Sequence, residues 1–156
     1  LCCLEKNAAA LKIRAAYELG VRSNLTHECH LEFSSPSAVE CHFAQKMSGY
    51  DQEHFVVLCL NAKNILIEEC ELSVGTLDKT IAGVRDVAKR ALMASARSII
   101  LVHNHPSGDP HPSRADVELT RRIEKGCDLF EICVLDHVII GGEGRSYSLK
   151  SCGDMS

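Results

Sequence analysis

Apolar residues near the start of the chain recur at helical spacing. Residues 4–19 carry apolar side chains three or four positions apart, and Gly20 follows, which together predict a helix. A polar connector rich in His, Ser and Pro comes next. A second, shorter helix is predicted over residues 35–47, where Pro36 suits the first helical turn.

The period of the apolar pattern changes from residue 53 onward. Residues 54–60 form a dense apolar run and residues 65–74 form a second one, with the turn-like sequence Asn-Ala-Lys-Asn between them. Both runs are rich in residues that favour strands, so they predict an antiparallel hairpin. Helical spacing returns over residues 78–96, and the short apolar run at 98–102 predicts a strand in the centre of a sheet.

Three further elements are predicted in the last third of the chain. A loop rich in Pro and His covers residues 103–112, and a helix follows over residues 113–125, ended by Gly126. Residues 130–140 predict a strand, and a glycine-rich turn leads to a last short strand at 146–149.

This order of elements predicts an α/β fold, in which a mixed β-sheet is flanked by helices. We expect residues 1–34 to be a helical N-terminal extension with a linker, and residues 35–156 to form the main domain. Because the first residue is Leu1 and not Met, we expect the chain to be a piece of a longer protein whose upstream region is missing.

The composition is that of a globular protein, with 46% hydrophobic and 24% charged residues. Its nine cysteines are an odd number and contain no Cys-x-x-Cys pair, which disfavours both a disulfide framework and a cysteine zinc site. Cys59, Cys70 and Cys133 stand among Val, Ile and Leu, so we interpret them as reduced, buried packing residues.

The hydropathy and the charge of the chain argue against a membrane protein, a secreted protein and a nucleic-acid-binding protein. No apolar run reaches the roughly 18 residues of a membrane helix and no signal segment is visible, so a cytoplasmic setting without membrane contact is expected. The net charge of −4 and the lack of a Lys/Arg cluster argue against a nucleic-acid partner.

The candidate chemistry lies in the loop after residue 102. His103 and His105 are two positions apart, so an extended backbone points both imidazoles to one side. Pro106 and Gly108 then turn the chain, and Asp116 follows in the first turn of the next helix. Two imidazoles, one carboxylate and a water molecule are the donor set of a catalytic zinc ion, which lowers the pKa of its water to about 7.

Amide hydrolysis also needs a group that accepts the proton of the water. Glu53 is the candidate because it opens the predicted hairpin, at one end of the sheet. Spacing alone leaves three rivals on the second strand of that hairpin, namely Glu68, Glu69 and Glu71.

Each of these residues also has an interpretation without catalysis. Ser113 and Asp116 fit the first and fourth positions of a capping box, in which we expect the carboxylate to serve either as a cap or as a ligand. His137 in the last long strand is interpreted first as a hydrogen-bonded core residue, with a metal ligand or a supporting partner of a ligand as alternatives. His111 is expected to be an exposed loop residue.

The complete pattern His103-Asn104-His105-Pro106, six residues, Ser113, two residues, Asp116 resembles the JAMM signature of MPN+ metalloproteases. Three segments are similar to sequences of the RadC family in particular, namely HNHPSGDPHPSRAD, QEHFVVLCLNAKNILI and LDHVIIGG. This resemblance extends over nearly all of residues 35–151, and residues 8–20 resemble the linker helix of longer members.

The resemblance implies a cytidine deaminase-like MPN fold with defined roles. His103, His105 and Asp116 would bind Zn²⁺, Glu53 would act as general acid and base, and Ser113 would stabilise the oxyanion. Two departures from the family pattern, Val84 before Arg85 and the additional His111, touch no motif position.

The function predicted from the sequence is a zinc-dependent hydrolase, a peptidase or isopeptidase acting on a peptide or protein substrate. The alternative is a DNA repair-associated or non-catalytic MPN-like interaction module. A third alternative, zinc hydrolysis of a non-peptide amide or a nucleobase, is disfavoured, because the His-x-Glu and Pro-Cys-x-x-Cys signature of zinc deaminases is absent. The edges of the sheet leave a homo-oligomer open.

Overall fold

The computed structural model describes residues 31–33, 35–47, 49–75 and 83–155. They belong to the second of the two compact units into which the chain divides, Leu31–Ser156. The helix predicted over residues 4–19 lies outside the described residues, as does the division at residue 34, so both stay predictions. None of the described helices is long and apolar enough to cross a bilayer.

The fold is built on one five-stranded sheet with the order β2-β1-β3-β4-β5. The pairs β1–β2, β1–β3 and β4–β5 are antiparallel, whereas β3–β4 is parallel, which confirms the predicted mixed sheet and the predicted hairpin. The strands are β1 (His54–Leu60), β2 (Leu66–Val74), β3 (Ser98–Asn104), β4 (Cys133–Ile140) and β5 (Ser146–Ser148).

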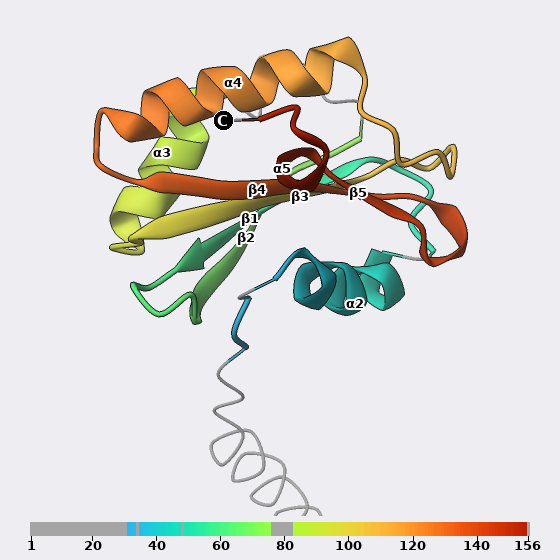
Figure 1. Ribbon diagram of the computed structural model, residues 1–156, viewed down its shortest axis with the longest axis horizontal. Helices are drawn as coiled ribbons and strands as arrows, with labels where there is room; N and C mark the ends of the chain where they lie inside the picture. The colour runs from blue at the N-terminus through green and yellow to red at the C-terminus, as the bar shows by residue number, and fades with distance from the viewer. Residues whose placement is uncertain (1–30, 34, 48, 76–82, 156) are drawn as a thin grey trace, which may run out of the picture. The chain divides into compact units, whose positions relative to one another are not determined.

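Helices cover both faces of the sheet, as Figure 1 shows. Helix α2 (Pro36–Met47) lies on one face, and α3 (Val84–Met93) with α4 (Arg114–Asp128) lies on the other. The chain ends with the short helix α5 (Leu149–Cys152), which follows a 3-10 turn, η1 (Gly142–Gly144). The α/β layering expected from the sequence is therefore present.

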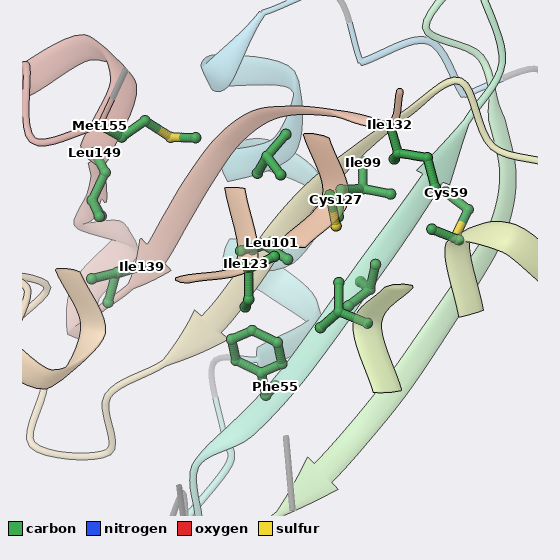
Figure 2. Packing of buried hydrophobic residues seen from close by; sticks show 14 residues of the cluster. Phe55, Cys59, Ile99, Leu101, Ile123, Cys127, Ile132, Ile139, Leu149 and Met155 are labelled. Carbon is green, nitrogen blue, oxygen red and sulfur yellow. The ribbon is translucent and has the colours of Figure 1, made fainter. Parts of the chain in front are cut away.

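Successive side chains of a strand point to opposite faces of the sheet, so the protein has one hydrophobic core on each face. Phe55, Val57 and Cys59 of β1 point to the face of α3 and α4, whereas the residues between them point to the face of α2. Figure 2 shows the first core, in which Leu101 and Ile123 pack beside Phe55. Because Leu101 and residue 103 share one face of β3, the strand delivers the side chain of residue 103 to the layer beneath α4.

Helix α3 ends earlier than the sequence predicts. Residue 96 lies outside it, because Ser95 adopts a positive φ of 52° and the chain turns away. The N–H of Ala96 donates to the carbonyl oxygen of Ala91, and the N–H of Ser95 donates to that of Leu92. These are the bonds of a helix C-cap in which one residue is left-handed.

Helix α4 runs through Gly126, which was wrongly predicted to end it. A Cβ built on Gly126 would lie only 2.1 Å from Cγ1 of Val84, at the start of α3. The glycine therefore allows two helices to pack closely and does not serve as a stop signal.

The remaining differences concern the ends of strands. Strand β3 continues through Asn104, so His103 belongs to the sheet and not to the loop. Strand β4 begins at Cys133, because Glu131 takes a positive φ of 57° before it. The helix α5, which was not predicted, takes Leu149 out of the last strand.

Two residues differ in environment from their predictions. Cys133 is exposed, because it is the first residue of β4 and borders a surface hollow, whereas Cys59 and Cys70 are buried as expected. Phe33, which was predicted to lie in the linker, is buried in the core against α2. The neighbouring Glu32 pairs with Ile65, which extends the sheet by one bridge.

Candidate metal centre

His103 lies near the end of β3 and is fully buried. In the sheet it stands between Phe55 of β1 and Ile139 of β4. The ring of Phe55 stacks on its imidazole with the centroids 6.2 Å apart. Burial, with the neighbouring His137 second, holds the pKa of His103 well below its usual value, so the imidazole is neutral at physiological pH.

His105 continues the direction of β3 beyond its last residue. Its N–H donates to the carbonyl oxygen of Ile140 at 2.9 Å, and its Nδ1 lies 2.7 Å from the carbonyl oxygen of Asp109. Because a carbonyl can only accept, Nδ1 carries the proton, and the neutral ring has its lone pair on Nε2. That Nε2 lies 2.9 Å from Nε2 of His103.

The loop after β3, whose Asp109 carbonyl oxygen contacts His105, is hydrogen-bonded to the connection between β4 and β5. The N–H of Gly142 donates to the carbonyl oxygen of Gly108 at 2.9 Å, and the Arg145 guanidinium donates to the same oxygen. A Cβ on Gly141 would lie 2.7 Å from that oxygen, so only glycine permits this approach.

Asp116 completes the group from the first turn of α4. Its Oδ2 accepts a hydrogen bond from the N–H of Ser113 at 2.7 Å, and Oγ of Ser113 accepts from the N–H of Asp116 at 3.2 Å. This is the predicted capping box. The same carboxylate places Oδ1 3.8 Å from Nε2 of His103 and Oδ2 3.6 Å from Nε2 of His105.

The two predicted roles of Asp116 are therefore not exclusive, contrary to the expectation from the sequence. A carboxylate has about four lone-pair positions, of which the cap uses one. Burial alone would raise the pKa of Asp116, but the neighbouring His105 and the hydrogen bonds with Ser113 lower it below its usual value. The carboxylate is thus ionised and oriented at the same time.

The donor set of these three residues fits a divalent cation. One ligand atom from each of His103, His105 and Asp116 lies within 4.8 Å of the others. Two imidazole lone pairs and a carboxylate repel one another unless a proton or a metal ion lies between them. The structure thus brings together all three residues that the motif predicted as ligands.

A cleft of about 960 Å³ opens beside this group. Glu53, His105, Ser113 and Asp116 line it. The pKa of His105 is raised, chiefly by its contact with Asp116, with a smaller contribution from the Glu53 carboxylate. Glu53 therefore lies on the wall of the same cleft as His105 and Asp116.

The three rival glutamates on β2 do not line this cleft. Glu69 pairs with Lys46 and His42, and Glu71 pairs with His54. Glu68 is exposed to solvent. Of the four candidates, Glu53 is the one that lines the cleft.

The position of Glu53 is fixed by contacts of its neighbours. The side chain of Asn104 accepts from the N–H of His54 at 2.8 Å and donates to the carbonyl oxygen of Gln52 at 2.9 Å. The carbonyl oxygen of Glu53 itself accepts from the N–H of Gly75. One buried amide therefore holds the peptide groups on both sides of Glu53.

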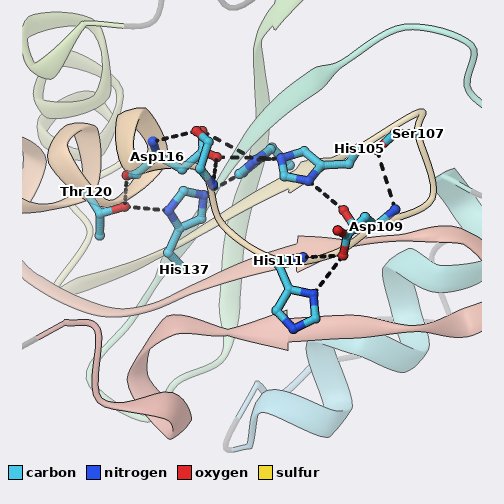
Figure 3. Close-up of polar contacts among 9 residues, drawn as sticks. His105, Ser107, Asp109, His111, Asp116, Thr120 and His137 are labelled. Atoms are coloured by element: carbon cyan, nitrogen blue, oxygen red, sulfur yellow. Dashed lines mark hydrogen bonds and ion pairs between the residues drawn. The ribbon is translucent and has the colours of Figure 1, made fainter.

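His137 and His111 differ sharply in environment. His137 is fully buried in β4, with its Nε2 2.8 Å from Nδ1 of His103, and burial lowers its pKa to about 4. It is hydrogen-bonded in the core, as the first interpretation predicted, and its partners are Thr120 and the candidate ligand His103, which also fits the alternative of a supporting partner (Figure 3). His111 is exposed, as expected, and pairs with Asp109.

Asn104 and Thr120 contact the site but were missed from the sequence. Thr120 stands four residues after Asp116, on the same face of α4, so helical spacing could have indicated it. Asn104 lies within the motif, but its partners are 50 and 52 residues away and gave no local signal.

Comparison with known proteins gives a consistent result. Residues 33–154 match the family model described as the RadC-like JAB domain. A UPF0758 protein of Caldanaerobacter subterraneus is 48% identical over 94% of this chain and 63% of its own length. UPF0758 proteins of Methanosarcina barkeri and Geobacter sulfurreducens are 44% and 42% identical over 94% of the chain, in each case with 64% of their own length covered. The chain thus spans just under two thirds of these relatives.

Proposed function

Because the chain belongs to the family of RadC-like JAB domains, we propose that it is a zinc-dependent hydrolase that cleaves amide bonds in a peptide or protein. The observation that carries this proposal is the convergence of His103, His105 and Asp116 at the edge of an open cleft. A purely structural histidine pair would not need a lined cavity beside it.

Zinc is the metal that this donor set suits best. Two neutral imidazoles and one carboxylate are the protein ligands of many catalytic zinc sites, in which a fourth position stays open. When bound there, the ion supplies Lewis acidity, which polarises a carbonyl oxygen and lowers the pKa of water to about 7. His103 and His105 would hold the ion through Nε2, and Asp116 would hold it through the carboxylate that the bond from Ser113 keeps in place.

Glu53 is proposed as the general acid and base. Its carboxylate accepts a proton from the attacking water and later donates that proton to the leaving nitrogen, so it is ionised again at the end of the cycle. Support comes from its position on the cleft wall and from the Asn104 contacts that fix the backbone around it.

Ser113 is proposed to donate a hydrogen bond to the carbonyl oxygen as negative charge develops on it. Its Oγ accepts from the N–H of Asp116, which leaves the hydroxyl proton available for a substrate. The residue is exposed and lines the cleft, as such a role requires. Donors of this kind typically contribute about 10²–10³ in rate.

The proposal is tested with zinc-loaded protein and fluorogenic peptides, some joined by ordinary peptide bonds and some through the ε-amine of lysine. We expect Glu53→Gln to lower kcat by at least about 100-fold while the zinc content stays at the wild-type level. Glu68→Gln is the matched control, since Glu68 is an exposed carboxylate outside the cleft, and it should leave both quantities unchanged.

Two outcomes would contradict the proposal. Full activity of the Glu53→Gln variant would remove this residue from the reaction. Zinc-loaded wild-type protein that cleaves no member of the panel, but binds DNA with an affinity that falls steeply with salt, would favour the DNA-associated module instead.

A further inference from the structure

A chain of buried hydrogen bonds extends from His103 away from the cleft. Nδ1 of His103 lies 2.8 Å from Nε2 of His137, and Nδ1 of His137 lies 2.6 Å from Oγ1 of Thr120. The Thr120 hydroxyl in turn donates to the carbonyl oxygen of Asp116 at 2.7 Å. Figure 3 shows how Thr120 joins the helix of Asp116 to His137.

The direction of every bond in this chain follows from its last acceptor. A carbonyl oxygen has no proton to give, so the single proton of the Thr120 hydroxyl points to Asp116. The contact between Thr120 and His137 therefore needs a proton from the ring, which is carried on Nδ1 of His137.

The same reasoning continues to His103. A neutral His137 that carries its proton on Nδ1 has a bare Nε2, which can only accept. Nδ1 of His103 must then be the donor at 2.8 Å, and the lone pair of neutral His103 is on Nε2. This atom faces Asp116 and His105.

We propose that Thr120 and His137 are positioning residues that hold His103 in the tautomer with its proton on Nδ1, so that its Nε2 lone pair is directed at the metal. The inference rests on the proposed metal site and extends it to two residues that do not touch the ion. Partners of ligating histidines set both the tautomer and the orientation of the ring, and their loss typically costs about 10- to 100-fold in metal affinity.

Because His103 is buried, its tautomer must be set by neighbouring protein groups. Both His103 and His137 are completely shielded from solvent, and Phe55 packs on both rings, with centroids 6.2 and 5.8 Å away. A buried ring depends on protein groups to set its tautomer, because no solvent reaches it in this packing. The half-buried His105 instead uses a backbone carbonyl, that of Asp109.

Two pairs of variants separate this role from simple packing. Thr120→Val keeps the size of the side chain but removes the hydroxyl, whereas Thr120→Ser keeps the hydroxyl and removes a methyl group. His137→Leu removes the acceptor for His103, whereas His137→Gln has an amide oxygen that can reach about the position of Nε2. If these residues act through packing alone, the variant of each pair that better keeps the side-chain volume should bind zinc more tightly. If they control the tautomer of His103, the variant that keeps the polar atom should bind zinc more tightly.

The first measurement is the zinc dissociation constant, obtained by competition with a chromogenic chelator at a temperature where thermal denaturation shows each variant to be folded. We expect Thr120→Val and His137→Leu to bind zinc about 10- to 100-fold more weakly than wild type. Thr120→Ser and His137→Gln should stay close to the wild-type value. Equal affinity for Thr120→Val and Thr120→Ser would overturn the inference.

The second measurement reads the tautomers directly and does not depend on activity or on metal. In metal-free wild-type protein at pH 8, long-range ¹H–¹⁵N correlation spectra distinguish a protonated Nδ1 from a protonated Nε2. We expect the proton on Nδ1 for both His103 and His137, and a change at His103 in Thr120→Val. A proton on Nε2 of His103 in the wild type would refute the inference even if the protein binds zinc. The expected tautomers in a protein that binds no zinc would count against the proposed function alone.

Discussion

Among single residues, Asn104 has an unusual pair of contacts. Its side-chain amide forms hydrogen bonds with the backbone N–H of His54 and the backbone carbonyl oxygen of Gln52, the residues on either side of Glu53. We expect Asn104→Ala to lower kcat about 10-fold or more, because a displacement of Glu53, the proposed general base, by about 1 Å can cost that much. Zinc content should be unchanged, since the two hydrogen bonds of this amide go to the backbone of Gln52 and His54 and not to a candidate ligand.

Asn61 offers a matched control for this variant. Its Oδ1 also accepts two backbone N–H bonds, from Lys63 and Ile65, but at the opposite end of β1. Asn61→Ala should therefore cost similar stability and leave kcat as it is. If both variants lose activity in proportion to their melting temperatures, Asn104 has no special role in placing Glu53.

The buried histidines predict how stability depends on pH. The pKa of His137 is lowered to about 4 by burial, whereas an unfolded histidine titrates near 6.5. The unfolded chain thus binds more protons between these values, and the free energy of unfolding falls as pH decreases from about 6.5 to about 4. The contribution of His137 to this loss is on the order of 3 kcal/mol.

Urea denaturation of metal-free protein across this pH range measures the effect. His103 acts in the same direction, whereas His105 acts in the opposite one because its pKa is raised. Comparison with His137→Gln isolates the one residue, and its stability should depend less on pH than that of the wild type. Parallel curves for the two proteins would show that His137 titrates normally in the fold.

The cluster of His103, His105 and Asp116 could be predicted from the sequence, whereas the contacts that support it could be predicted only in part. His103, His105 and Asp116 stand within 14 residues of one another, and their spacing carries the chemical signal. A supporting role for His137 was among the alternatives that the sequence left open, but the contacts of Asn104 and His137 depend on strand pairing and on the packing of α4. Contacts between segments that are distant in the sequence therefore could not be predicted from local patterns.

Among the elements, the contact between α3 and α4 depends on Gly126. Because an added Cβ would lie 2.1 Å from Cγ1 of Val84, we expect Gly126→Ala to destabilise the protein by about 1–3 kcal/mol through overpacking. The measurement is chemical denaturation. Combining Gly126→Ala with Val84→Ala should recover most of the loss, because the clash is removed from the other side.

Gly49→Ala serves as the control for this experiment, since a Cβ there meets no atom within 4 Å. It should change the free energy of unfolding by less than about 0.5 kcal/mol. A double variant whose loss equals the sum of the two single losses would show that Gly126 and Val84 do not interact.

The types of the described elements followed from periodicity, but their ends did not. The hairpin, α2, α4 and the central strand were predicted because their apolar periods differ clearly. The end of α3 depends on the left-handed Ser95, and the passage of α4 through Gly126 depends on a neighbouring helix. Such ends are set by tertiary contacts and by single backbone conformations.

For the molecule as a whole, the sheet brings distant segments to one edge. Residues near position 53, the end of β2 and the loop after β3 all border the same cleft. The chain spans just under two thirds of its relatives, so the substrate and partners of the longer protein stay proposals. The net charge of −4 argues against a broad phosphate-binding surface on this chain.

Elemental analysis of purified wild-type protein beside His103→Ala tests the metal centre most directly. We predict about one zinc ion per chain in the wild type, removed by the substitution, since His103, His105 and Asp116 are the expected protein ligands. Equal zinc content in the two proteins, or a wild type that takes up no zinc when it is supplied in excess, would contradict the site.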